Sequence, residues 1–447
     1  MSGEALATWV SGLRYDELPA DVVTHAVRIV GDTLGVALGG TVEAEVRGAA
    51  LAAPRLGGVG PSTVLATGVG TSAYTASLLN GQAAITLELD EGSQWATNHP
   101  AAHVLPAVLA TGEEIDASGQ DLLVAFIAGY EAAARAGSAT TVRSAVHPFG
   151  TAMVVGAAAG VARLRGLGPS ATSEVLRVAA AMTPASTQRA ANQGATVRNV
   201  LTGMCSASGV LAAALAAGGV SGEQRALETV YGVVLGERFE SSKLDEGLGE
   251  RWFVLRNYFK LHACSRWNHA PIEAMASVLS RTALRAEDIE AVTVHTYAPA
   301  TRLDGTAPPN GFAAKHSIPY NVAVRILLGH NGIDAYAPTV VNDRVVRELA
   351  SRVRVVEDKS YTAAQPAVRA ARVEVLTKGD VVLQAVEDRA PGGFDNPYSA
   401  AVLDAKFADL VTRARSADLV APLRTWVAAL PDHPDLRGIH ELLRPSH

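Results

Sequence analysis

The chain has only two cysteines in 447 residues, Cys205 and Cys264. Two thiols exclude a disulfide framework, and an iron–sulfur cluster held by this chain alone would need about three or four cysteines. No Gly-x-Gly-x-x-Gly follows a predicted strand, and no loop of the form Gly-x-x-x-x-Gly-Lys-Ser/Thr occurs. If the protein is an enzyme, we expect its own side chains to carry the chemistry, with no cofactor.

Clustered basic charge and long apolar runs are also missing. The net charge is −6 and the isoelectric point is near 6.1, without a Lys/Arg cluster, which argues against binding to nucleic acid or to an anionic membrane. No uninterrupted apolar stretch of about 18 residues occurs, and the first residues do not follow the pattern of a secretory signal. We therefore expect a soluble, cytoplasmic protein.

Apolar residues make up 48% of the chain, enough to bury a large core in two or three domains. Up to about residue 265, apolar and small residues recur at helical spacing. The clearest predicted helices are 21–38, 118–136, 150–164, 170–182 and 203–217. Because Ala and Gly are so frequent in them, we expect their backbones to pack closely.

The pattern changes after His269. Residues 290–297, 352–356 and 372–376 alternate like half-buried strands, and a Lys-Gly-Asp turn leads into a further strand at 381–386. Helices are predicted at 272–279, 318–328 and 342–351, and again at 399–415 and 419–430. We expect a mainly α protein, with a helical domain (1–268 and 396–447) and a smaller inserted α+β domain (269–395).

The most informative segment is the polar loop 90–103, which interrupts the helical pattern with two carboxylates, a turn and two histidines. The apolar runs at 74–89 and 104–109 are predicted helices. Loops supported by rigid elements often carry function.

His99 is the first candidate in this loop. Pro100 keeps it outside regular helix, and an imidazole can act as base or acid near neutral pH; the alternative is a histidine that caps the next helix. Asp90 could orient a histidine or accept a substrate hydroxyl, or simply end a helix. His103 lies one helical turn beyond His99, as a second site residue or a packed side chain. This pair lacks the Glu of a His-Glu-x-x-His zinc motif and an evident third ligand, so we expect no metal.

Two candidates come from later helix starts. His147 precedes a predicted apolar helix whose dipole would lower its pKa and favour an anionic substrate; the alternative is a loop histidine. Arg198 could hold a carboxylate through two parallel hydrogen bonds.

The remaining candidates lie beyond residue 258. Lys260 follows aromatic residues that could desolvate it and lower its pKa, or it could be a lysine extending from a helix end to solvent. Tyr320 could donate to a leaving hydroxyl, or pack in a core. His269 begins a predicted helix, where it could be structural, and Cys264 is expected to be a small core residue.

Seven short motifs occur in a fixed order along the chain. They are residues 88–92 with His99-Pro100, 129–131 (Gly-Tyr-Glu), 147–150 (His-Pro-Phe-Gly), 193–199 (Gln-Gly-Ala-Thr-Val-Arg-Asn), 260–264 with His269, 315–320 (Lys-His-Ser-Ile-Pro-Tyr) and 396–398 (Asn-Pro-Tyr). In this set and order, over almost the full length, the chain resembles the MmgE/PrpD family.

The resemblance implies a helical domain with an α+β lid domain, a homodimer, and a site at the domain boundary without an obligatory metal. It favours catalytic roles for Asp90, His99, His147, Lys260 and Tyr320. Arg198, mainly from its motif, and His103 and His269 as further candidates, are expected to contact the substrate. The chain departs from some members, which carry a lysine in a Gly-x-x-x-Lys pattern where this chain reads Gly-Met-Cys-Ser-Ala at 203–207; this argues against cis-aconitate decarboxylation.

We therefore expect a cofactor-independent lyase for a small di- or tricarboxylic acid, acting by proton abstraction next to a carboxylate. The first hypothesis is hydration or dehydration of a 2-methylcitrate-like substrate. The alternatives are an epimerase of an iminodisuccinate-like acid, a decarboxylase of a cis-aconitate-like acid, a silent small-acid-binding homologue, and a zinc hydrolase.

Overall fold

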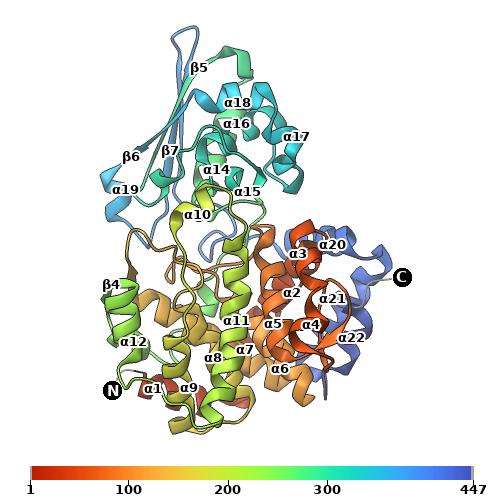
Figure 1. Ribbon diagram of the computed structural model, residues 1–447. Coiled ribbons are helices and arrows are strands. Elements are labelled where there is room, and N and C mark those ends of the chain that lie inside the picture. Colours follow the sequence, from red (N-terminus) through yellow and green to blue (C-terminus); the bar gives the residue numbers. More distant parts are fainter. Residues whose placement is uncertain (1–2, 444–447) are drawn as a thin grey trace. The chain divides into compact units, whose positions relative to one another are not determined.

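The computed structural model describes residues 3–443, which divide into two compact units (Figure 1). The helical unit comprises the chain up to Thr187, Val197–Tyr258 and the chain from Ser399 onward. The α+β unit comprises Gln188–Thr196 and Phe259–Tyr398.

Helices dominate the helical unit, which confirms the prediction of a mainly α protein. Its helices are α1 (Glu4–Gly12), α2 (Ala20–Gly40), α3 (Ala44–Ala50), α4 (Ala53–Gly57), α5 (Ala73–Thr86), α6 (Pro100–Ile115), α7 (Gly119–Ala139), α8 (Met153–Leu164), α9 (Pro169–Ala181), α11 (Val197–Ala217), α12 (Ala226–Thr229), α13 (Ser242–Asp245), α20 (Ala400–Ala414), α21 (Val420–Ala428) and α22 (Arg437–Leu443). Two short antiparallel pairs, β1 (Ser62–Thr63) with β2 (Gly70–Thr71) and β3 (Thr140–Val142) with β4 (Gly236–Phe239), were not predicted.

Glycines let the central helices approach closely, as their composition predicted. A Cβ added to Gly129 on α7 would lie 2.7 Å from the Gly156 carbonyl oxygen on α8. A Cβ on Gly81 of α5 would lie 2.7 Å from the Cα of Gly203 on α11. Side chains at these points would push the helices apart, so the bundle depends on residues without bulk.

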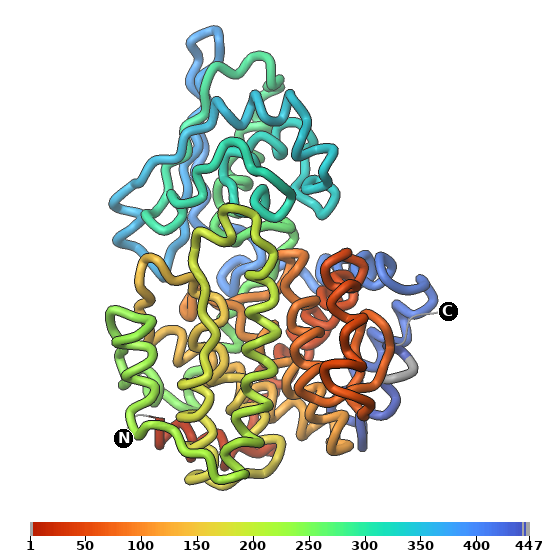
Figure 2. The backbone as a smooth tube through the Cα atoms, in the orientation of Figure 1, coloured from red at the N-terminus to blue at the C-terminus, as the bar shows by residue number. Residues whose placement is uncertain are grey.

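The last part of the chain returns to the helical unit, where α20 runs beside α2 (Figure 2). Lys406 of α20 is buried, and its Nζ donates to Asp32 Oδ1 on α2 at 2.6 Å and to the Leu89 carbonyl oxygen at 2.8 Å. One buried ammonium therefore ties α20 and α2 to the start of the polar loop.

The α+β unit contains a four-stranded sheet of order β6-β5-β7-β8. The strands are β5 (Ile289–Thr296), β6 (Val353–Glu357), β7 (Ala371–Thr377) and β8 (Val382–Glu387). Strand β5 pairs parallel with β6 and antiparallel with β7, which forms a hairpin with β8. The turn at 378–380 predicted for this hairpin is present, with Asp380 in the left-handed region at φ 57°.

Helices cover one face of this sheet. The helices of the unit are α10 (Gln188–Asn192), α14 (His269–Arg281), α15 (Gly311–Ala314), α16 (Ile318–Leu328), α17 (Pro338–Val341), α18 (Arg344–Ser351) and α19 (Lys359–Ala363). Met275 of α14, Val322 of α16 and Leu349 of α18 form one apolar core with Val292 and Val373 of the sheet. Burial alternates along β7, as expected for a sheet with one covered face.

The units meet along the chain at residues 258/259 and 398/399, whereas the predicted boundaries were 268/269 and 395/396. Segment 188–196 also belongs to the α+β unit, because Asn192 Nδ2 donates to the Arg302 carbonyl oxygen and Asn310 Nδ2 donates to the Gly194 carbonyl oxygen, both at 3.0 Å. The local spacing of apolar residues does not indicate that this segment leaves one unit and joins the other.

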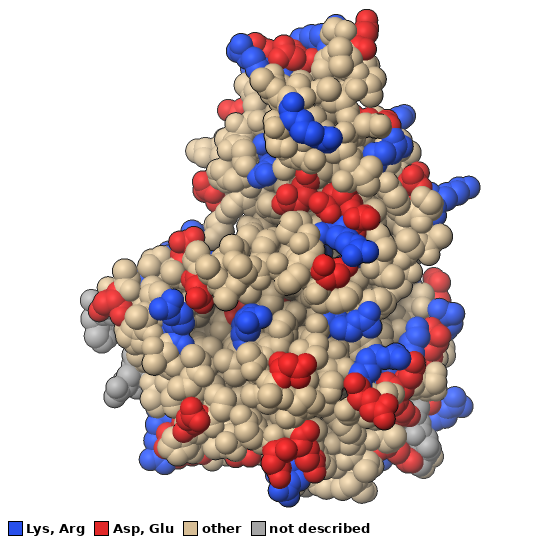
Figure 3. Space-filling model, turned by 180° about the vertical axis from the view of Figure 1, so that it is seen from behind, with Lys and Arg blue, Asp and Glu red and all other residues tan. Residues whose placement is uncertain are grey.

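Two helices, α2 and α11, are long and apolar enough to cross a membrane by length and composition. Inside the protein, 72% of the apolar window of α2 and 56% of that of α11 are buried, as in core helices of soluble proteins. On the face shown in Figure 3, acidic and basic side chains are interspersed.

The Lys406 ion pair gives a stability prediction. Lys406→Met should lower the free energy of unfolding by about 3–5 kcal/mol, because it removes one partner of a buried ion pair with Asp32. Denaturant unfolding measures the difference. The matched control is Arg424→Met, which removes an exposed partner 3.9 Å from Asp404 and should cost about 0–1 kcal/mol. Equal losses in the two variants would contradict the role of Lys406.

Candidate active site

The polar loop begins where α5 ends. Glu88 adopts a left-handed backbone conformation at φ 58°, which turns the chain out of the helix. The loop then closes on itself, since the backbones of Ser93 and Asn98 exchange two hydrogen bonds, and Gly92 exchanges two more with Tyr258. A Cβ on Gly92 would lie 2.5 Å from the Tyr258 hydroxyl, so this position requires glycine.

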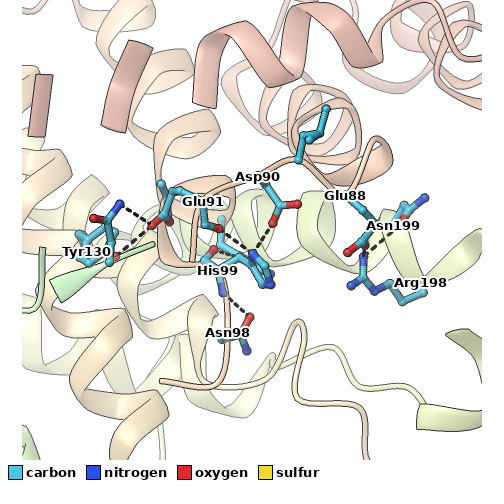
Figure 4. A network of polar contacts seen from close by, with 12 residues as sticks. Glu88, Asp90, Glu91, Asn98, His99, Tyr130, Arg198 and Asn199 are labelled. Carbon is cyan, nitrogen blue, oxygen red and sulfur yellow. Dashed lines mark hydrogen bonds and ion pairs between the residues drawn. The ribbon is translucent and has the colours of Figure 1, made fainter. Parts of the chain in front are cut away.

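His99 is at the N-cap position of α6, yet its side chain makes no capping hydrogen bond. Its Nδ1 instead lies 2.6 Å from the Glu91 carbonyl oxygen and forms a close ion pair with Asp90 Oδ2 (Figure 4). A carbonyl oxygen only accepts, so Nδ1 carries the proton. In the neutral ring the lone pair is therefore on Nε2, and the Asp90 carboxylate stabilises the cation that forms when Nε2 takes up a proton.

Glu91 holds His99 in place through its side chain as well as its carbonyl. Its Oε1 accepts from the Ala101 backbone N–H at 2.8 Å, and its Oε2 accepts from the Tyr130 hydroxyl at 3.1 Å and from Asn257 Nδ2 at 3.4 Å. Glu91 is fully buried, and burial raises its pKa to about 8, while these three hydrogen bonds oppose the rise. The carboxyl group is therefore mainly neutral at pH 7.

His103 lies one turn further along α6 and is also fully buried. Its Nδ1 donates to the His99 carbonyl oxygen at 2.7 Å, which assigns the proton to Nδ1. Burial lowers the pKa of His103 to about 3, with the charges of His99 and Arg198 acting in the same direction. This imidazole is neutral at working pH and presents Nε2 as an acceptor.

Phe149 links the predicted site residues of the helical unit. Its ring centroid lies 4.4 Å from that of His99, 6.2 Å from that of His103 and 4.9 Å from that of His147. The Arg198 guanidinium carbon lies 3.7 Å from the same centroid. The structure therefore brings His99, His103, His147 and Arg198 together around one aromatic ring, with Asp90 paired to His99.

His147 is buried, and its Nδ1 accepts from the Phe149 backbone N–H at 3.1 Å. The neutral ring therefore carries its proton on Nε2, the opposite tautomer to His99. Helix α8 begins at Met153, six positions after His147 and later than the predicted residue 150, because Gly150 turns the chain at φ 82°. The expectation that His147 lies at a helix start is therefore wrong, and the argument from a helix dipole does not apply to His147.

Arg198 is buried and paired with a protein carboxylate. Its Nη1 donates to Glu88 Oε1 at 2.5 Å and to Asn199 Oδ1 at 3.3 Å (Figure 4). The Glu88 carboxylate neutralises the charge that Arg198 was predicted to offer to a substrate carboxylate. The pair fixes the start of the polar loop to the first turn of α11.

In the α+β unit, Lys260 and His269 are both buried. Arg266 Nη1 donates to His269 Nδ1 at 3.1 Å, so the proton of the neutral imidazole is on Nε2. Burial lowers the pKa of His269 well below its usual value, and the charges of Arg266, His262 and Lys260 add to this effect. The predicted pair thus lies among the basic side chains Arg266 and His262, and His262 is itself bonded to the Glu273 carboxylate at 2.6 Å.

Tyr320, also in the α+β unit, is fully buried near the start of α16. Its hydroxyl donates to the Ala335 carbonyl oxygen at 2.6 Å. Burial raises the pKa of Tyr320. Its proton therefore already has a protein acceptor, the contact expected of a packed tyrosine.

Among residues 3–443, no group of three or more His, Cys, Asp or Glu side chains is arranged to hold a metal ion. Cys264 is buried, as expected for a core residue, and so is Cys205.

Sequence reasoning assigned no role to Glu88, Glu91, Asn98 or Phe149. Asn98 Oδ1 accepts from the His99 backbone N–H at 2.9 Å, while Asn98 Nδ2 donates to the Pro148 carbonyl oxygen at 2.5 Å. The sequence feature that could have pointed to Glu91 and Asn98 is the number of polar residues in the loop that precedes α6. The Glu88–Arg198 pair spans 110 positions, and no local pattern announces it.

The raised pKa of Glu91 gives a pH prediction. The folded protein keeps this proton up to a pKa of about 8, while the unfolded chain releases it near 4.5. The contribution of Glu91 to stability is therefore complete below about pH 4.5 and is lost as the pH rises to about 8. Glu91→Gln should flatten this part of the curve of unfolding free energy against pH, because a neutral amide mimics the protonated acid.

The matched variant Glu91→Ala should be less stable than Glu91→Gln at every pH, because it leaves the Ala101 N–H and the Tyr130 hydroxyl without their partner. A pH profile for Glu91→Gln that stays parallel to that of the parent would show that Glu91 is ionised in the folded protein.

Comparison with known proteins covers nearly the whole chain. Residues 4–237 match the MmgE/PrpD N-terminal domain and residues 262–428 match the MmgE/PrpD C-terminal domain. The chain is 25% identical over 467 residues to the cis-aconitate decarboxylase-like protein oryM of Aspergillus oryzae, covering 98% of this chain and 96% of that protein. It is 25% identical over 461 residues to the cis-aconitate decarboxylase of Homo sapiens, covering 99% and 94%.

The cis-aconitate decarboxylase of Aspergillus terreus is 28% identical over 291 residues, covering 61% of this chain and 59% of that protein. The two matched domains together account for most of the chain. The family predicted from the seven motifs is thereby confirmed: this chain is a member of the MmgE/PrpD family.

Proposed function

We propose that the protein is a cofactor-independent lyase for a small di- or tricarboxylic acid, with His99 as the base. The observation that carries this proposal is the geometry at His99 Nδ1, which contacts the Glu91 carbonyl oxygen and the Asp90 carboxylate. This arrangement leaves Nε2 as the basic nitrogen and places a carboxylate to stabilise the imidazolium.

The reaction begins when His99 Nε2 removes a proton from the carbon next to a substrate carboxylate. The electron pair of the C–H bond moves into that carboxylate as an enediolate, and then forms the carbon–carbon double bond as the hydroxyl on the neighbouring carbon leaves. The proton that completes the water comes from the His99 imidazolium, so that His99 ends neutral, and His147 is suited to donate a hydrogen bond from Nε2 to the leaving hydroxyl. The products are water and the unsaturated acid.

Arg198 and Tyr320 have supporting roles in this scheme. Because Arg198 is paired with Glu88 and stacked on Phe149, we assign it to holding the loop rather than to clamping a substrate carboxylate. The Tyr320 proton is used within the α+β unit, which favours His147 as the hydrogen-bond donor to the leaving hydroxyl. Carboxylate binding by Lys260 and His269 stays a prediction, supported by the Arg266 guanidinium beside His269.

We propose (de)hydration of a 2-methylcitrate-like hydroxy acid as the first candidate reaction. Decarboxylation of a cis-aconitate-like acid is the second candidate, favoured by the names of the relatives. Epimerisation needs the same proton abstraction followed by protonation on the opposite face. A silent acid-binding homologue would have no use for opposite tautomers at His99 and His147.

A substrate screen read by mass spectrometry tests the proposal, since loss of water, loss of carbon dioxide and isomerisation without mass change identify the three reactions. His99→Gln and Asp90→Asn should each lower kcat/KM roughly 100- to 10,000-fold, the size of a lost general base or of its orienting partner. His330→Gln, at an exposed histidine in the α+β unit, is the control and should match the parent.

Two results would overturn the proposal. One is full activity of the His99→Gln variant. The other is the absence of both turnover and deuterium exchange from heavy water into every acid of a broad polycarboxylate panel, which would indicate a silent homologue.

A further inference from the structure

Three fully buried side chains near His99 have polar atoms without a hydrogen-bond partner among the described residues. The atoms are His103 Nε2 on α6, and Asn199 Nδ2 and Thr202 Oγ1 on α11. A buried polar atom without a partner costs roughly 1–3 kcal/mol, and folded proteins seldom leave several together. Such a group calls for a ligand or another polar partner.

The contacts of α6 with α11 place these side chains in one region. Ser206 Oγ donates to the His103 carbonyl oxygen at 2.7 Å and to the Thr202 carbonyl oxygen at 3.2 Å, so the His103 turn packs on the Thr202–Ser206 turn. Asn199, Thr202 and Ser206 follow helical spacing on one face of α11. The charge of the neighbouring Arg198 also acts on the His103 ring.

The region lies beside the proposed base. His103 is one helical turn from His99 and donates to its carbonyl oxygen, and the Phe149 ring contacts both imidazoles. A substrate whose reacting carbon is at His99 would thus have a neighbouring group within reach of His103.

The donors and acceptors of the cluster define the chemistry of that group. His103 Nε2 only accepts, because its proton is on Nδ1. Asn199 Nδ2 only donates, since its amide oxygen accepts from Arg198, and the Thr202 hydroxyl can donate or accept. A hydroxyl group satisfies all three, because it donates once and accepts twice. A carboxylate has no proton to give and would face the lone pair of His103.

We propose that His103, Asn199 and Thr202 form a subsite that binds a hydroxyl group of the substrate, and so select hydroxy acids over acids that lack the hydroxyl. The inference rests on the proposed function only in taking a small carboxylic acid as the ligand. It names the substrate class: a hydroxy di- or tricarboxylate rather than an unsaturated acid such as cis-aconitate.

Matched ligand pairs test the proposal by calorimetric binding to the intact protein. Citrate is compared with tricarballylate, and malate with succinate, since each pair differs by one hydroxyl. We expect at least one hydroxy acid to bind roughly 10- to 100-fold tighter than its partner, as lost hydrogen bonds and stranded buried groups predict. Equal binding within both pairs, or no binding by any of the four acids, would overturn the proposal.

Variants assign any preference to the cluster. His103→Leu replaces the acceptor with an apolar side chain of similar size, and it should reduce the ratio of the two dissociation constants within a pair to nearly one. Thr202→Val should reduce this ratio in part. Thr172→Val is the control, because Thr172 is a buried threonine of α9 whose hydroxyl donates to the Leu167 carbonyl oxygen, and it should keep the ratio. If His103→Leu does not fold, the affinity ratio of Thr202→Val is compared with that of the parent protein. A ratio that is unchanged in Thr202→Val, and in His103→Leu where it folds, would overturn the assignment.

Turnover of the same acids, measured in parallel, separates the two proposals. Preferred binding of the hydroxy acid without turnover of any acid would support the subsite and count against the lyase. Turnover without a binding preference for the hydroxy acid would support the lyase and count against the subsite.

Discussion

The geometry of the helical unit depends most on one contact, the hydrogen bond from His99 Nδ1 to the Glu91 carbonyl oxygen at 2.6 Å. A backbone acceptor fixes the tautomer whatever the ionisation of the neighbouring carboxylates, so the basic nitrogen is defined by the course of the main chain. Asp90 adds the compensating charge. Because Glu91 also caps α6 through its buried side chain, the same residue sets both the orientation of the imidazole and the start of the helix that carries it.

Three histidines around Phe149 show how backbone contacts give chemically different groups from one residue type. His99 and His103 donate from Nδ1 to carbonyl oxygens, whereas His147 accepts at Nδ1 from a backbone N–H. The first two therefore present lone pairs at Nε2 and the third presents a proton. Phe149 lies against all three rings, so a single apolar side chain sets the spacing between the proton acceptors and the hydrogen-bond donor. Such opposed assignments are what a proton-transfer site requires.

Much of the fold could be predicted from the sequence, because helical and strand periodicities are strong in this chain. The helix 318–328 and the four strands of the sheet were placed within a residue or two. The excursion of 188–196 and the late start of α8 could not be predicted, since they arise from tertiary hydrogen bonds and from a left-handed glycine. In the site, Asp90 and His99 stood out as polar residues in an apolar context. The ion pairing of Arg198 with Glu88 and the acceptor of the Tyr320 hydroxyl depend on partners that periodicity does not reveal.

The contact of Lys406 with the Leu89 carbonyl oxygen has a consequence for biosynthesis. The polar loop is translated within the first quarter of the chain, but its anchor belongs to α20, which leaves the ribosome only after the whole α+β unit has been made. During that interval Asp32 of α2 also lacks its ion pair with Lys406. Completion of the loop's contacts is therefore coupled to completion of the polypeptide, and a nascent chain that ends before α20 lacks the Lys406 anchor.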